Sequence, residues 1–498
     1  MKKRVIFAVL AAVAFCLAFL LFSCGEKETE KPGQVPGENE TKQEQTEDTQ
    51  NEREFLVASY ELPEENFGEY EFKIMVRQGD PYWGSTEIIA DEENGDTVND
   101  AVYRRNREIE GKYNITIKGI PTPQGNLVGN LKKAVAAGDN NYDALLLPFN
   151  GASEATRNGY LYNLKEAPYV DLSQIWWDRS IMAETSIMHK IYYAASDANI
   201  MDKDGTWTMM FNKKMISDFG LEDPYALVRE NRWTFDKFLE MTKGISQDLD
   251  GDGKFGQYDR YGFATTTDSV QSLIFASGLR IIRKDADDIP YFALNGDDVM
   301  PRLEKIAHIM RGDNITQLMQ DYTGTDIHLI IQASFEDSRA LFYAEVMQCV
   351  IRLRQMDTDF GIIPLPKWDE NQPLYHTNVH QWACNNLSIP SNVENIGRSG
   401  LILEAIAHGG AKYIRPAYYD VVLKTKQARD NESSEMLDII FESRSADIGY
   451  IDNVGSLIPD LVNTIMKKEN AFASTLEKRH DKIQQDLDKI IRAYENLG

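Results

Sequence analysis

The sequence predicts an α/β fold with more than one hydrophobic core. Apolar patterns typical of strands and of helices alternate along residues 71–147, and this order builds a parallel sheet with helices on both faces. Roughly 445 residues follow a polar N-terminal stretch, which is more than a single core usually holds. No segment after residue 23 is apolar enough to span a membrane.

The first 23 residues have the features of a signal peptide. A positive start, Met1-Lys2-Lys3-Arg4, is followed by the almost wholly apolar run Val5–Phe22. Leu21-Phe22-Ser23-Cys24-Gly25 then resembles a bacterial lipobox, in which cleavage precedes a cysteine that carries the lipid. We expect Cys24 to anchor the protein outside the cytoplasm. The alternative is an uncleaved transmembrane helix, for which a run of about 18 residues is at the lower limit of length.

A polar stretch follows the cysteine. Val35 is the one aliphatic residue between Gly25 and Glu52. Such a composition buries too little apolar surface to offset the entropy that ordering costs. We therefore expect a signal peptide at 1–23, a lipidated cysteine with a disordered tether at 24–54, and a folded domain at 55–498.

The chain is strongly acidic. It has 53 Lys and Arg residues against 78 Asp and Glu residues, a net charge of −25 at pH 7. A surface of this sign repels nucleic-acid phosphates and anionic lipid. The charge therefore argues against nucleic-acid binding and suits a neutral or cationic ligand.

Two cysteines belong to the folded domain, because Cys16 leaves with the signal peptide and Cys24 takes the lipid. Cys349 falls in a predicted helix and Cys384 in a predicted strand. An extracytoplasmic location permits a disulfide between them. Free cysteine is often a small core residue, however, and we expect two separate buried thiols.

The first part of the folded domain alternates strands and helices. Short apolar or alternating runs mark its strands, and apolar residues three and four apart mark its helices. Asp96 or Thr97 is suited to cap the first helix, and Gly138 to end the second. The expected order is strand Glu71–Arg77, helix 98–109, strand Asn114–Lys118, helix 128–135 and strand Tyr142–Leu147.

Three further elements are predicted beyond this region. Tyr192–Ser196 has the pattern of a strand and is followed by a turn. Thr234 is a suitable N-cap for an amphipathic helix. Residues 476–494 place their apolar side chains on one side of a helix, which we expect to pack on the domain.

Ligands of parallel α/β sheets bind beyond the carboxyl ends of the strands. Segments 79–84 and 148–151 follow two such ends, and each combines an aromatic ring with a hydrogen-bonding side chain. A ring covers the C–H face of a sugar, while Asp and Asn bind hydroxyls. Asp80, Trp83 and Asn150 are therefore candidate ligand-binding residues. The alternative is that the rings merely cap the sheet.

Two more tryptophans lie in polar segments that are typical of loops. Trp207 follows Gly205-Thr206, and Trp382 follows His380-Gln381. A core role is less natural for an indole in such surroundings. We therefore add both residues to the candidate ligand-binding set as stacking rings.

Residues 248–259 match the spacing of a calcium-binding loop. Asp248, Asp250 and Asp252 occupy loop positions 1, 3 and 5, and a glycine follows at position 6. The backbone carbonyl of Lys254 fits position 7, and Asp259 stands at position 12, where the motif usually has Glu. We expect structural Ca²⁺ here. The alternative is an acidic, glycine-rich turn without metal.

Several further segments together resemble the extracellular solute-binding proteins of bacterial ABC transporters, especially the carbohydrate-type lipoproteins. The similarity runs over most of residues 70–455 and depends on the order of the segments, since none is decisive alone. The segments are Asn99–Asn106, Trp176-Trp177-Asp178, Phe211–Lys214, Arg232–Phe235, Asp250–Gly253 with Tyr261-Gly262, Phe360–Lys367, Pro416–Asp420 and Glu435–Asp438.

The resemblance implies a type II periplasmic-binding-protein fold, in which two discontinuous α/β lobes are joined by a hinge and hold the ligand in an interlobe cleft. Lobe closure on the ligand would be a hinge motion. The implied partners are a carbohydrate and a membrane permease, and the implied state is a monomer without enzymatic activity. Asp197 joins the candidate ligand-binding residues, because the resemblance places the strand before it near the cleft.

The sequence leaves two other functions open. One is a secreted carbohydrate-active enzyme that uses two of the many carboxylates. The other is a surface lipoprotein for sugar sensing or adhesion that has the fold without transport. Nothing in the sequence names the sugar.

Overall fold

The computed structural model describes residues 52–79, 88–324, 327–423 and 431–497. The chain divides after Phe55, and both of the larger β-sheets belong to the unit that starts at Leu56. The predicted signal peptide, the lipidated Cys24 and the tether up to residue 51 lie outside the described residues. Among the described helices, none is both long and apolar enough to cross a membrane.

The sheet of the first lobe has the strand order β12-β3-β1-β2. Strand β1 pairs in parallel with β2 and β3, as predicted, and β12 is antiparallel to β3. The fourth strand comes from a distant part of the chain, so this lobe is discontinuous in sequence. The strands are β1 (Tyr70–Arg77), β2 (Ile115–Thr122), β3 (Ala144–Pro148) and β12 (Asn385–Ser388).

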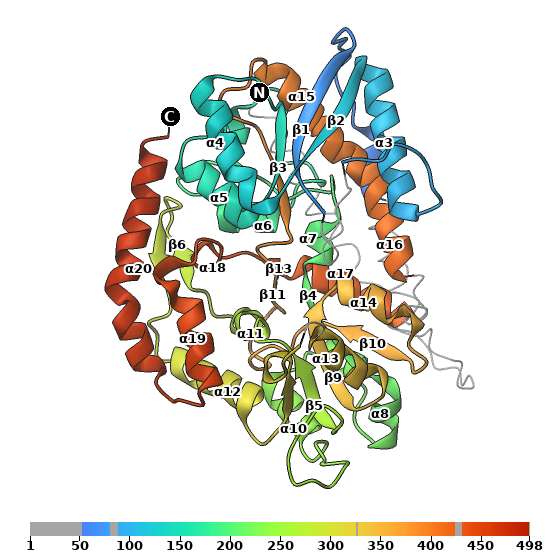
Figure 1. Cartoon of the computed structure of the whole chain (residues 1–498), viewed down its shortest axis with the longest axis vertical. Coiled ribbons are helices and arrows are strands. Elements are labelled where there is room, and N and C mark those ends of the chain that lie inside the picture. Colours follow the sequence, from blue (N-terminus) through green and yellow to red (C-terminus); the bar gives the residue numbers. More distant parts are fainter. Residues whose placement is uncertain (1–51, 80–87, 325–326, 424–430, 498) are drawn as a thin grey trace, which may run out of the picture. The chain divides into compact units, whose positions relative to one another are not determined.

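Helices cover both faces of this sheet (Figure 1). Ile74 of β1 belongs to the core formed with Ile109 of α3, whereas its neighbour Met75 belongs to the core formed with Leu131 of α4. This alternation is the period of two that a strand buried on both faces requires. The helices are α3 (Thr97–Tyr113), α4 (Leu127–Ala137), α5 (Phe149–Arg157) and α15 (Ile396–Gly409).

The predicted helix ends of this lobe are confirmed. The Asp96 side chain accepts hydrogen bonds from the N–H groups of Val98 and Asn99 and so caps α3. Gly138 ends α4 in the left-handed conformation, with φ of 68°, which glycine adopts without a steric cost. Other boundaries differ from the prediction. Strand β2 extends to Thr122 and β3 begins at Ala144, while α5 begins directly after β3, where a loop was expected over 148–151.

The sheet of the second lobe has the strand order β10-β4-β9-β5-β8. Strand β4 is antiparallel to β9 and β10, and β5 is parallel to β9 and β8. Thr234 caps α10 (Phe235–Thr242) as predicted, since its side chain accepts from the Lys237 N–H. The strands are β4 (Trp207–Asn212), β5 (Tyr261–Thr265), β8 (Thr316–Leu318), β9 (Ala340–Val346) and β10 (Phe360–Ile363).

Further helices and short strands lie within or beside the two lobes. Helix α11 (Ser269–Ala276) follows β5 in the chain. The antiparallel pair β6-β7 comes next, and α12 (Val299–Arg311) follows that pair. The remaining short elements are α6 (Arg179–Thr185), α8 (Lys213–Asp218), α9 (Pro224–Arg229), β6 (Ile282–Lys284), β7 (Pro290–Phe292), α13 (Ile327–Glu336), α14 (Gln348–Arg352) and α17 (Asn431–Glu442).

The chain passes between the two sheets at several places. It leaves the first lobe through α7 (Met201–Asp204) and returns through residues 379–384, which join β11 (Thr377–Asn378) to β12. Strand β13 (Arg444–Ser445) pairs with β11 beside these crossings. Two α/β lobes joined by crossing segments are the predicted architecture, which the structure confirms.

Buried ion pairs join the crossing segments. Lys203 lies 3.2 Å from both Asp197 and Asp202, measured from the Nζ atom to a carboxylate oxygen. The Arg444 guanidinium lies 2.6 Å from Asp202 and 2.6 Å from Asp178. Because each charge is buried, the loss of one partner would leave an unpaired charge, which is strongly destabilising.

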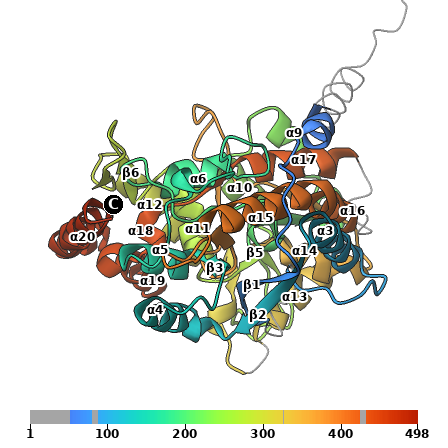
Figure 2. The same ribbon diagram turned by 90° about the horizontal axis from the view of Figure 1, so that it is seen from above.

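The C-terminal segment forms α18 (Ile448–Ile451), α19 (Leu457–Met466) and α20 (Phe472–Glu495). Figure 2 shows α20 on the same side as α12, α18 and α19. Its apolar stripe, which includes Ile483 and Leu487, is buried in the core, so the predicted packing on the domain is confirmed. The prediction of a strand at 192–196 is wrong, because this segment makes only isolated bridges.

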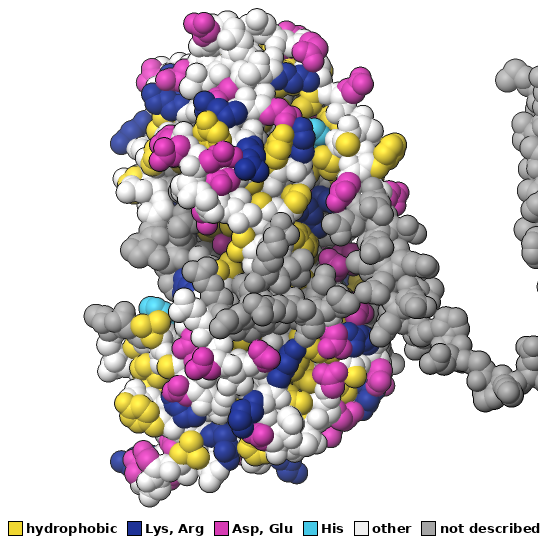
Figure 3. Space-filling view, turned by 90° about the vertical axis from the view of Figure 1, so that its right-hand side faces the viewer, with side chains coloured by type: hydrophobic (Ala, Val, Ile, Leu, Met, Phe, Trp, Pro, Cys, Tyr) yellow, Lys and Arg dark blue, Asp and Glu magenta, His cyan; other side chains and the backbone are white. Residues whose placement is uncertain are grey.

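Cys349 and Cys384 are buried and are not joined by a disulfide, as expected. Cys349 lies in α14, and Cys384 directly precedes β12. The surface drawn in Figure 3 carries acidic and basic side chains side by side over the described residues of both lobes.

Candidate functional site

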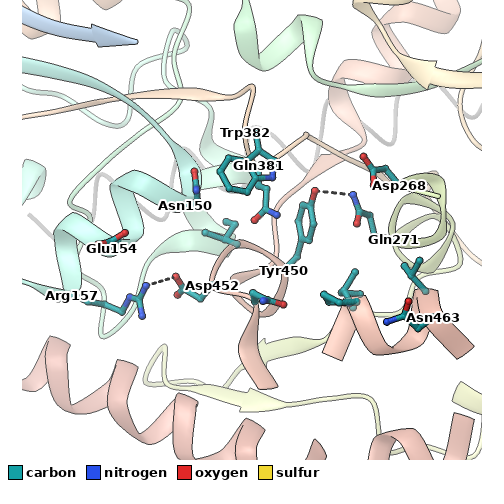
Figure 4. Close-up of a pocket in the computed structure, with 15 residues that line it drawn as sticks. Asn150, Glu154, Arg157, Asp268, Gln271, Gln381, Trp382, Tyr450, Asp452 and Asn463 are labelled. Atoms are coloured by element: carbon teal, nitrogen blue, oxygen red, sulfur yellow. Dashed lines mark hydrogen bonds and ion pairs between the residues drawn. The ribbon is translucent and has the colours of Figure 1, made fainter. Parts of the chain in front are cut away.

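A pocket of about 600 Å³ lies between the lobes. Helix α5 of the first lobe forms one wall, α11 and α19 of the second lobe form the opposite side, and the crossing segment at Gln381 and Trp382 lies between them (Figure 4). Volumes of roughly 300–1,000 Å³ are typical of small-molecule sites. The pocket is therefore of suitable size for a small-molecule ligand.

Asn150 lines the pocket just beyond the carboxyl end of β3. It is the second residue of α5, which begins where β3 ends at Pro148. Its Oδ1 atom is buried and has no hydrogen-bond partner among the described residues. A buried amide oxygen without a partner costs free energy unless a ligand or water satisfies it.

Trp382 lies on the crossing segment and is 45% exposed, although it is a large apolar residue. Its carbonyl accepts a hydrogen bond of 2.9 Å from Nη1 of Arg77, the last residue of β1. The indole is thus held beside the carboxyl end of β1, while Asn150 follows the carboxyl end of β3. The pocket therefore lies beyond the carboxyl ends of these strands, where ligands of parallel α/β sheets bind.

The Gln381 side chain ties the crossing segment to α18. In the orientation that satisfies both polar atoms, its nitrogen donates to the carbonyls of Tyr450 at 3.1 Å and Ile451 at 3.2 Å. Because the nitrogen is used in this way, the amide oxygen is the atom of Gln381 that remains for other contacts.

Tyr450 and Gln271 join α18 to α11 on the side of the second lobe. Nε2 of Gln271 donates to the Tyr450 hydroxyl at 2.8 Å, as the dashed line in Figure 4 shows. Burial raises the pKa of Tyr450 well above its usual range, and the nearby Asp268 carboxylate adds to this. The hydroxyl therefore stays protonated and available as a donor.

The charges of the pocket wall are mainly acidic. Arg157 is already paired, since its Nη2 atom lies 3.1 Å from Oδ1 of Asp452. The same carboxylate accepts a 2.7 Å hydrogen bond from the Ser153 hydroxyl. Glu154 and Asp268 are exposed at the pocket, and Asp268 has a histidine, His380, at 3.8 Å.

The structure brings two of the six predicted ligand-binding residues into this pocket, namely Asn150 and Trp382. Asp80 and Trp83 lie outside the described residues. Asp197 does not line the pocket, because its side chain is buried in the ion pair with Lys203, and Arg415 lies 3.6 Å away.

The prediction that Trp207 lies in a loop is wrong. Trp207 is the first residue of β4, pairs with Val346 of β9, and is only 1% exposed in the hydrophobic core. The polar residues before it in the sequence belong to the crossing segment, and the strand begins directly after them. A buried core ring of this kind cannot stack on a ligand in the pocket.

The acidic loop follows α10, and none of its residues lines the pocket. Carboxylate oxygens of Asp248, Asp250 and Asp252 lie within 4.8 Å of one another. Asp259 is not part of this cluster, because its two oxygens accept hydrogen bonds from the N–H groups of Leu249 and Gly256. The N–H of Lys254 donates to Asp252 at 2.7 Å.

Asp268, Gln271 and Tyr450 are among the pocket residues that have no counterpart in the sequence-based prediction. A signal for the first two was present, since Tyr261–Thr265 is a buried strand followed by polar residues, the same pattern that indicated Asn150. Tyr450 had no local signal. Its position depends on the C-terminal segment folding back across the pocket.

Comparison with known proteins gives a match in fold. No family model matches the sequence, and no curated protein matches it. Solved structures do match, and among them are extracellular solute-binding proteins that bind carbohydrates.

Three of these structures show the extent of the similarity. The extracellular solute-binding protein from Staphylococcus aureus in complex with maltose has a TM-score of 0.59 at 12% identity, over 86% of this chain and 99% of its own. An ABC substrate-binding protein from Listeria monocytogenes in complex with cycloalternan has 0.54 at 12%, over 84% and 99%. The maltose/maltodextrin-binding domain from Bdellovibrio bacteriovorus bound to maltotriose has 0.50 at 15%, over 85% and 98%. At such low identities the TM-scores show a shared fold alone, which confirms the predicted fold class.

Proposed function

We propose that the protein binds a carbohydrate in the pocket between its lobes. The observation that carries the proposal is the exposed Trp382 indole in a pocket whose neighbouring side chains are amides and carboxylates. An indole face and hydrogen-bonding oxygens are the two kinds of contact that a sugar ring needs. The shared fold with maltose-, cycloalternan- and maltotriose-binding proteins supports the same ligand class.

A thermal-shift screen against a carbohydrate panel tests this proposal. A ligand that binds only the folded state raises the unfolding midpoint by mass action. We expect at least one saccharide to raise the midpoint of the wild-type protein in proportion to the logarithm of its concentration. A panel of mono- and oligosaccharides without any such response would contradict the proposal.

We further propose that the protein binds its sugar without changing it and delivers it to an ABC-transporter permease. The structural neighbours are binding proteins, which supports binding over catalysis. Incubation with the best ligand should return the saccharide intact, as followed by chromatography. Hydrolysis that depends on the folded protein would instead favour a carbohydrate-active enzyme.

The permease partnership requires a location outside the cytoplasm. We propose a monomeric lipoprotein that is anchored through Cys24 and held near the membrane by its tether, as the lipobox-like segment predicts. Cys24→Ser should abolish labelling by a fatty acid. A label that the variant retains would show that the anchor lies elsewhere.

We also propose that the acidic loop binds structural Ca²⁺. The convergence of Asp248, Asp250 and Asp252 supports this, because Ca²⁺ prefers several carboxylate oxygens. Calcium should raise the unfolding temperature of the wild type, and Asp250→Ala combined with Asp252→Ala should remove most of the response. Equal responses in both proteins would exclude this loop.

A further inference from the structure

The charged side chains of the pocket are mostly hydrogen-bond acceptors. Glu154 and Asp268 contribute exposed carboxylates, which can only accept hydrogen bonds when ionised. These atoms call for a ligand that donates.

Several donors of the pocket are used within the protein, while the Tyr450 hydroxyl and the amides of Asn453 and Asn463 can still donate. The Gln381 nitrogen faces two backbone carbonyls, and the Gln271 nitrogen donates to the Tyr450 hydroxyl. The one guanidinium among the described pocket residues, that of Arg157, lies 3.1 Å from Asp452 and has its Nε atom 3.4 Å from the Ser153 carbonyl. An anionic ligand would therefore compete with Asp452 for its counter-charge.

The net charge of the pocket lining also favours a neutral or cationic ligand. The described lining carries three carboxylates, on Glu154, Asp268 and Asp452, against the single guanidinium. A ligand carboxylate near Glu154 or Asp268 would meet a like charge in a partly desolvated site, where repulsion is screened less than in bulk water. A hydroxyl or an ammonium group meets no such penalty.

We propose that this pocket selects a donor-rich saccharide, either uncharged or amine-bearing, and excludes acidic saccharides such as uronates. The inference rests on the proposed carbohydrate function and adds the chemical class of the ligand. It assigns Glu154 and Asp268 as the residues that set the selection, because both are exposed at the pocket and neither has a Lys or Arg partner within ion-pair distance among the described residues.

The test compares one saccharide with its own oxidised form. The neutral or amine-bearing saccharide that binds most tightly in the screen is titrated by calorimetry, and so is the same saccharide after oxidation of its primary alcohols to carboxylates. We expect the oxidised form to bind at least tenfold more weakly. The ratio of the two dissociation constants, oxidised over unoxidised form, should fall at least fivefold in the Glu154→Gln, Asp268→Asn double variant, because both repelling charges are gone.

A matched control separates the pocket charges from the overall charge of the protein. Glu477 is an exposed carboxylate on α20 and does not line the pocket. Glu477→Gln should leave the ratio between the two ligand forms unchanged. A higher salt concentration should reduce the ratio in the wild type, since screening weakens the repulsion.

The outcomes distinguish this inference from the proposed function. Equal affinity for the two ligand forms, a uronate as the tightest binder of the panel, or a ratio that the double variant leaves unchanged would overturn the inference while carbohydrate binding stands. A panel without any binder would contradict the proposed function and, with it, the inference.

Discussion

At the scale of single residues, the proposed sugar contact depends most on the indole of Trp382. The ring is 45% exposed and lines the pocket, so its removal leaves no cavity in the core. Trp382→Ala should weaken binding of the best saccharide by roughly 2–4 kcal/mol, as expected for a stacked aromatic contact. Titration calorimetry measures the change.

The control for this substitution is Tyr291→Ala, which removes a similarly exposed ring on β7, outside the pocket lining. We expect the control to bind like the wild type. An affinity that Trp382→Ala leaves unchanged, in a protein whose circular dichroism is native, would show that the indole is not a contact.

Glu345 near the pocket should make stability depend on pH. Burial raises its pKa from 4.5 to about 7, the Val346 N–H opposes the shift, and Asp268 adds to it. Between these two pH values the unfolded chain loses the proton and the folded protein keeps it. The free energy of unfolding therefore falls as pH rises through this window, by up to about 3 kcal/mol.

Glu345→Gln should remove this part of the pH dependence, as chemical denaturation at a series of pH values would show. The variant should gain stability relative to the wild type as pH rises from 4.5 to 7.5. The exposed control Glu477→Gln should leave the profile unchanged in shape. Parallel profiles for wild type and Glu345→Gln would mean that this carboxyl ionises normally in the folded state.

At the scale of elements, the long helix of the first lobe contains a π-helical segment, η6 (Gly410–Ile414), between α15 and α16 (Arg415–Leu423). A Cβ atom at Gly410 would overlap the Asp197 carbonyl, so this glycine lets the helix approach the crossing segment closely. Gly410→Ala should destabilise the protein by about 1–3 kcal/mol, because backbone atoms would have to move.

Gly129→Ala in α4 is the matched control. A Cβ atom there meets nothing within 4 Å, so alanine should stabilise the helix by up to about 1 kcal/mol. Thermal unfolding followed by circular dichroism compares the two variants. An unchanged midpoint for Gly410→Ala would show that the helix can shift without cost.

Elements whose signal is local were predictable from the sequence. The strands and helices from β1 to β3 follow from apolar periodicity and from caps that lie within a few residues. The pairing of β12 with β3 could not be predicted from the sequence, because these strands are far apart in the chain and their contact depends on the fold. Trp207 was misplaced for the same reason, since its burial comes from pairing with β9.

The pocket residues also divide into those with a local signal in the sequence and those whose position depends on the fold. Asn150 was found because it follows a strand end, which is a local feature. Trp382 was selected for its polar neighbours in the sequence, and the structure places it in the pocket. Tyr450 was missed because only the tertiary path of the C-terminal segment brings it to α11.

At the scale of the whole molecule, one continuous core joins the lobes. The same buried cluster includes Leu145 of β3, Phe263 of β5 and Leu487 of α20. The end of α20 also contacts the first lobe, where Nζ of Lys190 donates to the Tyr494 carbonyl at 2.9 Å. We expect the two lobes to unfold in one cooperative transition.

Urea unfolding followed by both tryptophan fluorescence and circular dichroism tests this expectation. Coincident curves are the predicted result, because neither lobe can lose its share of the common core independently. Two separated transitions would show that the lobes are independent folding units despite the shared cluster.

The carbohydrate in the interlobe pocket is the central claim, and the crystal structure of the protein with its best-binding saccharide tests it most directly. We predict electron density for the sugar between α5 and α11, with a ring against the Trp382 indole and a polar group of the sugar within hydrogen-bond distance of the Asn150 side-chain amide. A saccharide bound elsewhere on the protein, with this pocket holding only water, would contradict the account.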